Sequence, residues 1–178
     1  MKNIILVLST FFIISCSNKP SLQKYFVEKS ENPEFIAVDI ASSIINTDKI
    51  SLTTQEEEAL KSFDKINVLA YKKDSLQDIK VVEEERNNVK SILKDETYQE
   101  LIKFGNPKNE AKVYLVGETD KIDEVVIYAS GKEEGFVVAR VLGDNMTPNT
   151  VLNLIEVIKK ADLDLEQLKP LQEALGKK

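Results

Sequence analysis

The side chains able to do chemistry in this chain are of few kinds. The 178 residues include no histidine and one cysteine, Cys16. This composition removes the commonest general base, serine–histidine and cysteine–histidine catalysis, zinc sites built from imidazole or thiolate, and an intramolecular disulfide. Carboxylates, lysine, hydroxyl groups and the backbone remain. The sequence therefore indicates a cellular location and a fold class more clearly than a reaction or a ligand.

Cys16 is the residue with the most specific context. It ends an apolar run over residues 4–14 that follows Lys2 and is closed by Ser15. A positive start and a short apolar stretch are typical of an export signal. A helix of this length covers roughly 17 Å, too little for a hydrocarbon core of about 30 Å. We therefore expect an export signal over residues 1–15 rather than a transmembrane anchor.

The end of this signal resembles the bacterial lipobox, in which a cysteine receives diacylglycerol and the peptidase cuts before it. The thiolate is the best available nucleophile for a thioether bond, and the small Ser15 lets the peptidase reach the backbone. We predict cleavage between Ser15 and Cys16 and lipidation of Cys16. The alternatives are an ordinary signal peptide cut near Ser15 and an uncleaved segment with an inert thiol.

Lipidation would hold the mature chain to a membrane through its N-terminal acyl chains, since each buried methylene contributes about 0.8 kcal/mol. Ser17 and Asn18 follow the cysteine. By resemblance to lipoprotein sorting rules, the lack of Asp there favours the periplasmic face of the outer membrane. Residues 16–21 form a short tether that contains Pro20. The net charge of −6 disfavours a nucleic-acid partner, so the expected partners are the membrane and an envelope protein.

Two patterns are compatible with catalysis or metal binding. Ser-x-x-Lys, the nucleophile pair of penicillin-interacting enzymes, occurs three times, but 12 serines and 22 lysines in 178 residues give about 1.5 such pairs by chance. An acidic turn could hold calcium or serve glycoside chemistry, although it lacks the ligand order of an EF-hand, and we favour its interpretation as a solvated hairpin tip. The pairs are Ser21/Lys24, Ser62/Lys65 and Ser91/Lys94, and the turn carries Glu118, Asp120, Asp123 and Glu124. We assign no catalytic residue, no metal site and no cofactor.

Arg140 stands out among the remaining charged residues because it lies in an apolar stretch, residues 136–142. We expect it on an exposed face or beside a carboxylate partner. It would either contact an anion or a partner, or point outward with its stem covering the sheet. The acidic runs Glu56–Glu58 and Glu83–Glu85 are interpreted as solvated helix faces favoured by the helix dipole.

The elements that must position these residues follow from periodicity and from start and stop signals. Alternation and β-branched residues predict strands, and short turns between the last three favour an antiparallel meander. The strands are expected at residues 34–41, 65–71, 112–117, 124–130 and 135–142. Helices are expected at residues 22–29, at 57–63 after a cap at 53–56, along 78–104 with an interruption at Asp95, and after Thr147-Pro148, with a helical turn over 41–45.

Two segments of this pattern carry expectations about packing. In the helix after Pro148 we expect the apolar side chains to face inward, namely Val151, Leu152, Leu154, Ile155 and Ile158. The tail over residues 162–178 repeats leucine at helical spacing, interrupted by Pro170. It is either a terminal helix that packs or projects, or a partner-binding helix.

The chain divides into the signal peptide 1–15, the lipidated tether 16–21, one α+β domain over 22–161, and the C-terminal amphipathic helical extension 162–178. We predict an antiparallel sheet of about five strands with helices packed mainly on one face. Residues 20–158 resemble the domain of unknown function 4252 family of bacterial lipoproteins. The resemblance rests on residues 25–26, 35–40, 65–69 and 98–102 and on Gly143-Asp144. These are packing and turn positions, so the resemblance implies no catalytic residue.

Three classes of function fit these observations. The leading interpretation is a non-enzymatic, lipid-anchored module of the cell envelope that binds a ligand or another protein. The second is an envelope hydrolase that uses carboxylate, Ser or Lys groups, and it needs at least two of them converging in a pocket. The third is a purely structural envelope component.

Overall fold

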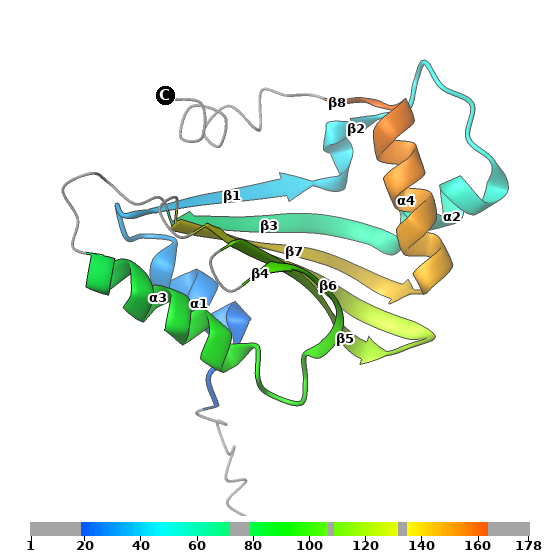
Figure 1. The fold of residues 1–178 in the computed structure, drawn as a ribbon. Coiled ribbons are helices and arrows are strands. Elements are labelled where there is room, and N and C mark those ends of the chain that lie inside the picture. The colour runs from blue at the N-terminus through cyan, green and yellow to red at the C-terminus, as the bar shows by residue number, and fades with distance from the viewer. Residues whose placement is uncertain (1–18, 72–78, 107–108, 132–134, 164–178) are drawn as a thin grey trace, which may run out of the picture.

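The computed structural model describes residues 19–71, 79–106, 109–131 and 135–163 (Figure 1). Its centre is one antiparallel sheet of six strands in the order β1-β3-β7-β6-β5-β4. The strands are β1 (Phe35–Ala41), β3 (Phe63–Tyr71), β4 (Gln99–Asn106), β5 (Asn109–Glu118), β6 (Lys121–Gly131) and β7 (Gly135–Met146). The α+β class is confirmed, and the sheet has one strand more than predicted.

The additional strand is β4, where the sequence pattern predicted a helix. Leu101, Ile102 and Phe104 fit one side of a helix, but they also fit an extended edge strand. Gly105, with a φ of +83°, lets the chain turn back, and β4 pairs with β5 from Gln99↔Leu115 to Asn106↔Asn109. Pairing with β5 therefore decides between a helix and a strand, which the local sequence does not distinguish. All eight residues of β4 are exposed.

Helices lie on both faces of the sheet, which corrects the prediction of one face. α1 (Leu22–Lys29) and α3 (Ile79–Ile92) cover one face, while α2 (Thr54–Ser62) and α4 (Pro148–Lys160) pack on the other (Figure 1). The α1/α3 side holds a core of aromatic and aliphatic side chains, with Phe35, Tyr71 and Phe136 in mutual ring contact. The α2/α4 side holds a separate core that includes Phe63, Leu154 and Val157.

On the second face, α4 buries only part of its apolar side. Leu154 and Val157 are buried, whereas Leu152 and Ile155 are exposed. The prediction that both of these face inward is therefore wrong. The helix start is confirmed, since Thr147 caps α4 and Pro148 is its first residue.

The chain also forms a small pair of strands at the edge beside β1. After β1 the chain makes the short helix η1 (Ser42–Ile44) and strand β2 (Ile45–Asn46), which pairs with β8 (Asp162–Leu163). The first two residues of the expected C-terminal extension are thus in a strand. Residues 164–178 and the signal and lipidation residues 1–18, including Ser15 and Cys16, lie outside the described residues. In the described part of the chain, no helix is long and apolar enough to cross a membrane.

Candidate functional site: an uncovered apolar face

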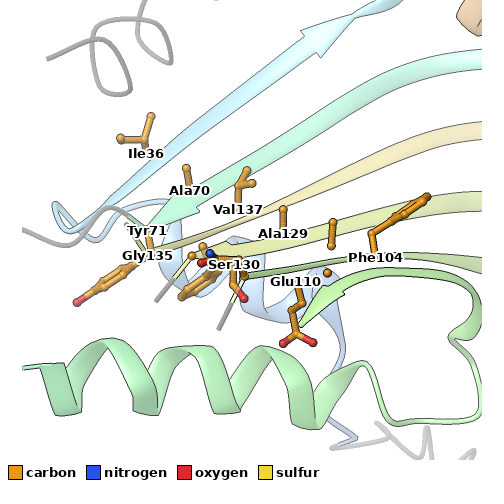
Figure 2. Close-up of a pocket in the computed structure, with 14 residues that line it drawn as sticks. Ile36, Ala70, Tyr71, Phe104, Glu110, Ala129, Ser130, Gly135 and Val137 are labelled. Carbon is orange, nitrogen blue, oxygen red and sulfur yellow. The ribbon is translucent and has the colours of Figure 1, made fainter. Parts of the chain in front are cut away.

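A row of apolar side chains crosses the whole sheet on the α2/α4 side. The strand registers place one residue from each strand next to its neighbour, in the order Ile36, Ala70, Val137, Ala129, Ala111, Phe104. Figure 2 shows Ile36, Ala70, Val137, Ala129 and Phe104 pointing away from α3, whereas Tyr71 and Glu110 point toward it. We call these six residues, from Ile36 to Phe104, the apolar row.

A second row runs parallel to the first, two residues further along each strand. It contains only aliphatic side chains, namely Val38, Val68, Ala139, Ile127, Val113 and Ile102. An antiparallel sheet with one solvated face normally alternates apolar and polar residues along each strand. Two adjacent apolar rows on the second face of this sheet instead indicate a face that is built to be covered.

The covering elements reach only part of this surface. Ile127 is 41% exposed, Ile102 is 45% exposed and Phe104 is 58% exposed. Their neighbours Ala111, Val113, Ala129 and Val137 are partly accessible. We call these seven residues the free face, and none of them is charged or polar. Exposed contiguous apolar surface of this kind marks sites of interaction with other molecules.

The free face is hollowed between large side chains. A cavity of about 440 Å³ lies over the apolar row, with Ile36 and Phe104 as its bulky ends. Ala70, Ala111 and Ala129 lie between them, so the floor has little side-chain volume (Figure 2). Pockets for organic ligands have volumes of about 300–1,000 Å³ and mainly apolar linings. The shape therefore suits an apolar group lying across the strands.

The polar groups at the rim of this cavity are already engaged with the protein. Glu110 points away from the free face and forms an ion pair with Lys90 of α3. Arg86 of α3 donates a hydrogen bond of 2.7 Å to the carbonyl oxygen of Gly131, at the end of β6. The cavity thus offers an apolar surface rather than a set of converging polar groups.

Arg140 lies on the other face of the sheet and has the carboxylate partner that the sequence allowed. It is 4% exposed, and its Nε and Nη2 atoms donate to the two carboxylate oxygens of Glu124 at 2.7 and 2.8 Å. It also donates to Gln23 and lies over the ring of Phe26. The expectation of an outward-facing arginine is wrong, and the contacts of Arg140 with Gln23 and Phe26 connect α1 to the sheet.

A cluster of ionisable groups joins α1 to α3. Burial and the hydrogen bond to Glu85 raise the pKa of Tyr25. Burial opposes the charged form of Lys29, but its 2.8 Å hydrogen bond to Glu85 and the negative charges of Glu85 and Glu28 together outweigh burial and raise the pKa of Lys29. Burial likewise opposes the charge of Glu85, and the hydrogen bonds from Lys29 and Tyr25 nevertheless lower its pKa. These shifts keep Tyr25 and Lys29 protonated, so neither side chain is poised to act as a base.

The residues proposed from catalytic or metal-binding patterns are distributed over separate places. Ser21 caps α1 by accepting from the amide of Lys24, and the hydroxyl of Ser62 donates to a carbonyl at the end of α2. Glu118, Asp120 and Asp123 are exposed, while Glu124 points inward to Arg140. Within the described ranges, no three Asp, Glu or Cys side chains gather as metal ligands.

The two acidic runs interpreted as solvated faces contain three engaged residues, and one of them is Glu83, which forms an ion pair of 2.7 Å with Arg86 of the same helix. Glu56 is buried at the start of α2 and forms an ion pair with Lys160 of α4. Glu85 accepts hydrogen bonds from Tyr25 and Lys29. The other members of the two runs are exposed or partly exposed. The prediction of solvated acidic runs is therefore wrong only for the single residues whose side chains meet a partner.

The free face was not among the sites predicted from the sequence. The sequence does contain a signal for it. Strands β5, β6 and β7 carry apolar residues that point to both faces of the sheet, as in the consecutive residues Val125, Val126 and Ile127. That pattern predicts burial on both faces. It does not reveal which stretch of the second face the helices leave open, because this depends on where α2 and α4 pack.

Comparison with known proteins identifies the family of the chain. Neither a curated protein nor a solved structure is significantly similar to this chain. The family described as domain of unknown function 4252 matches residues 25–154, which is more than half of the chain and includes most of the sheet, the free face and the start of α4. The chain belongs to the domain of unknown function 4252 family.

Proposed function

We propose that this protein is a lipid-anchored component of the cell envelope, on the periplasmic face of the outer membrane, that acts as a binding module through the free face. The observation that carries the proposal is the row of uncharged side chains from Val137 to Phe104 around the cavity, in which three partly accessible residues lead to the exposed Phe104. Burying exposed apolar surface contributes about 25 cal/mol per Å². A partner with an apolar face would therefore be stabilised there without any catalytic group.

The described chain begins at α1, on the side of the sheet opposite to the free face. This placement supports a partner for the free face other than the anchoring membrane. Lys19 and Pro20 lead into α1 on the side of the molecule opposite to α2 and α4 (Figure 1). The six residue steps from Cys16 to Leu22 span at most about 22 Å. A lipidated Cys16 would thus hold the α1 side close to the bilayer, and the free face would point away from it.

The anchor is tested by mass spectrometry of the mature protein isolated from membranes. We expect an N-terminal Cys16 that carries diacylglycerol. Variant Cys16→Ser should remain uncleaved or unlipidated and should be lost from the membrane fraction. An unmodified Cys16, or an N-terminus at another residue, would contradict the lipid anchor.

The binding function is tested by photo-crosslinking in intact cells. A photoreactive phenylalanine derivative replaces Ile127 on the free face, and in a control it replaces Val27, which is 64% exposed on α1. We expect position 127 to yield a defined adduct with an envelope component that position 27 does not yield. The binding function fails if the two positions give the same adducts.

A further inference from the structure

The edge of the sheet at β4 is open. β4 is the last strand in the order of the sheet, and all eight of its residues are exposed. Three of them are large and apolar, since Leu101 is 54%, Ile102 is 45% and Phe104 is 58% exposed. No described helix therefore overhangs β4 on either face. An open edge offers unpaired backbone N–H and C=O groups to another strand.

The side chains of β4 restrict which strand can pair with it. Proteins protect open edges with charges and bulges, and β4 has a register irregularity between Glu100 and Ile102. Glu100 lies opposite Tyr114, and Lys103 lies opposite Lys112, two positions before Tyr114 on β5. Tyr114 belongs to the core on the α1/α3 side. Because the irregularity adds one residue, Glu100 and Lys103 project from this same face although they are three positions apart.

A second copy of β4 is complementary to this pattern. If it runs antiparallel with Glu100 opposite Lys103, two-fold symmetry repeats the same charge pair on the other side of the axis. This register also places Leu101 opposite Ile102 and Gln99 opposite Phe104. Opposite charges and apolar side chains across two strands are stabilising, whereas like charges are destabilising. A shift that places Lys103 opposite Lys103 is thus disfavoured, and the charges select one register.

The position of the chain start is compatible with this pairing. A two-fold axis perpendicular to the sheet leaves the α1 sides of both copies facing the same way. Lys19 forms an ion pair of 2.6 Å with Asp95, four positions before β4 begins at Gln99. The three residue steps from Cys16 to Lys19 span at most about 11 Å. Both lipid anchors could therefore enter one bilayer, whereas two copies stacked through their free faces would point their α1 sides in opposite directions.

From these observations we propose that the protein forms a two-fold dimer in which β4 pairs antiparallel with β4 of a second copy, with Glu100 of each copy opposite Lys103 of the other. Ile102 and Phe104 adjoin the shared edge, so the pairing joins the two free faces into one apolar surface on the side away from the bilayer. The inference rests on the proposed function in that it uses the lipid anchor and the free face.

The interface is small, and the shared membrane offsets this. Residues 99–104 of each copy take part, and three of these six side chains are large, apolar and about half exposed. Specific interfaces bury about 1,200–2,000 Å² in total, and a single strand pair lies at or below the lower end of this range. Attachment to one bilayer raises the effective concentration of the second copy, as a linker does for two binding modules. We therefore expect the dimer on the membrane.

The first test introduces two cysteines into the full-length, lipidated chain, as Glu100→Cys with Lys103→Cys. Opposite residues of an antiparallel pair have Cα atoms about 4.5–5.5 Å apart, within the range of a disulfide. Within one chain the two positions are roughly 8–10 Å apart along the strand, too far for a disulfide. We expect membrane-bound dimers on non-reducing gels from the double variant.

The two single variants are the matched controls. In the proposed register a cysteine at position 100 does not lie opposite position 100 of the second copy, and the same holds for position 103. Each single variant should therefore give few dimers. The proposal is overturned if the double variant gives no dimer, or if the single variants give as much dimer as the double variant.

The second test reverses the charges. Lys103→Glu replaces two attractive pairs by two repulsive ones and should lower the ratio of dimer to monomer in vesicles about tenfold. Adding Glu100→Lys to this variant restores opposite charges across the axis and should regain most of the dimer. Lys61→Glu, on an exposed residue of α2, is the control and should have no effect. An unchanged ratio in Lys103→Glu, or no recovery in the double variant, would count against the register.

The proposed function and this inference fail in different ways. A lipidated, membrane-bound chain without cysteine-linked dimers contradicts the dimer and leaves the anchor supported. Dimers of the double variant from a chain whose mass shows an unmodified Cys16 support the strand pairing and contradict the anchor. Dimers with no envelope component captured at position 127 support the pairing and contradict the binding function.

Discussion

Glu124 and Arg140 form the most deeply buried ion pair among the described residues, with side chains 10% and 5% exposed. Removing one partner of a buried pair leaves an uncompensated charge, which costs about 3–5 kcal/mol. We expect Glu124→Gln to lower the free energy of unfolding by about 3 kcal/mol, measured by urea denaturation. Glu156→Gln breaks the exposed pair with Lys159 and should cost less than about 0.5 kcal/mol. Equal effects of the two substitutions would contradict this account.

Asp95 is expected to make the free energy of unfolding decrease as the pH falls in the acidic range. Hydrogen bonds from Lys19 and then from the hydroxyl and amide of Thr97 lower the pKa of Asp95 from 3.8 to about 2. Because the folded pKa lies below the unfolded one, the stabilising contribution is complete above the unfolded pKa of about 3.9 and disappears as pH falls through the folded pKa. We expect the difference in stability between the wild type and Asp95→Asn to shrink toward pH 2.

This prediction is checked by following the Asp95 carboxyl carbon by NMR and by urea unfolding across the acidic range. A folded-state midpoint near the ordinary value of 3.8 would contradict it. Glu31→Gln, on an exposed residue elsewhere, serves as a control for the general effect of removing one carboxylate.

Single-residue chemistry was predictable from sequence only in part. The residue type and the apolar surroundings of Arg140 left open an exposed position or a carboxylate partner, and the choice between them depended on β6 lying beside β7. Glu56 and Glu85 lie in runs that look solvated, and only the packing of α2 on α4 and of α1 on α3 gives them partners. Local sequence does not contain these distances between elements.

At the scale of elements, α2 begins with a capping box. The side chain of Thr53 accepts from the amide of Glu56, and the carboxylate of Glu56 accepts from the amide of Thr53. Loss of such a cap costs about 1 kcal/mol. We expect Thr53→Ala to lower the unfolding free energy by about that amount, and Thr54→Ala, one residue inside the helix, to have a much smaller effect. Equal destabilisation would indicate that the cap is unimportant.

Elements with strong boundary signals were predicted in the correct order. Thr147-Pro148 marks the start of α4, and the three consecutive strands β5, β6 and β7 follow from alternation and short turns. The cap of α2 was recognised, but the helix begins at Thr54 and not at residue 57. The segment containing Leu101 and Phe104 was predicted wrongly, because its apolar spacing suits a helix and an edge strand equally. Its pairing with β5 is a contact between segments, and no local propensity encodes that contact.

At the scale of the whole molecule, the two faces of the sheet have different environments. One face is closed by α1 and α3, and the other is only partly closed by α2 and α4. The alternation of single strands predicts burial but not its extent. The free face could therefore be recognised only after the six strands were placed side by side and the two helices were seen to leave part of them open.

The proposed anchor predicts an orientation on the membrane. Spin labels at Val27→Cys on α1 and Ile127→Cys on the free face, in the lipidated protein on vesicles, report proximity to a relaxation agent attached to lipid headgroups. We expect stronger relaxation at position 27, because α1 lies beside the tether. Stronger relaxation at position 127 would show that the free face turns toward the bilayer.

The alanines beneath the cavity have a practical consequence. Ala111 and Ala129 are partly accessible, and a larger side chain at either position would extend into the hollow rather than into a core. Ala129→Phe should therefore fill the cavity while the protein folds as the parent protein does. The phenotype of cells that produce this variant would then show whether the cell needs only the presence of the protein or also its open cavity.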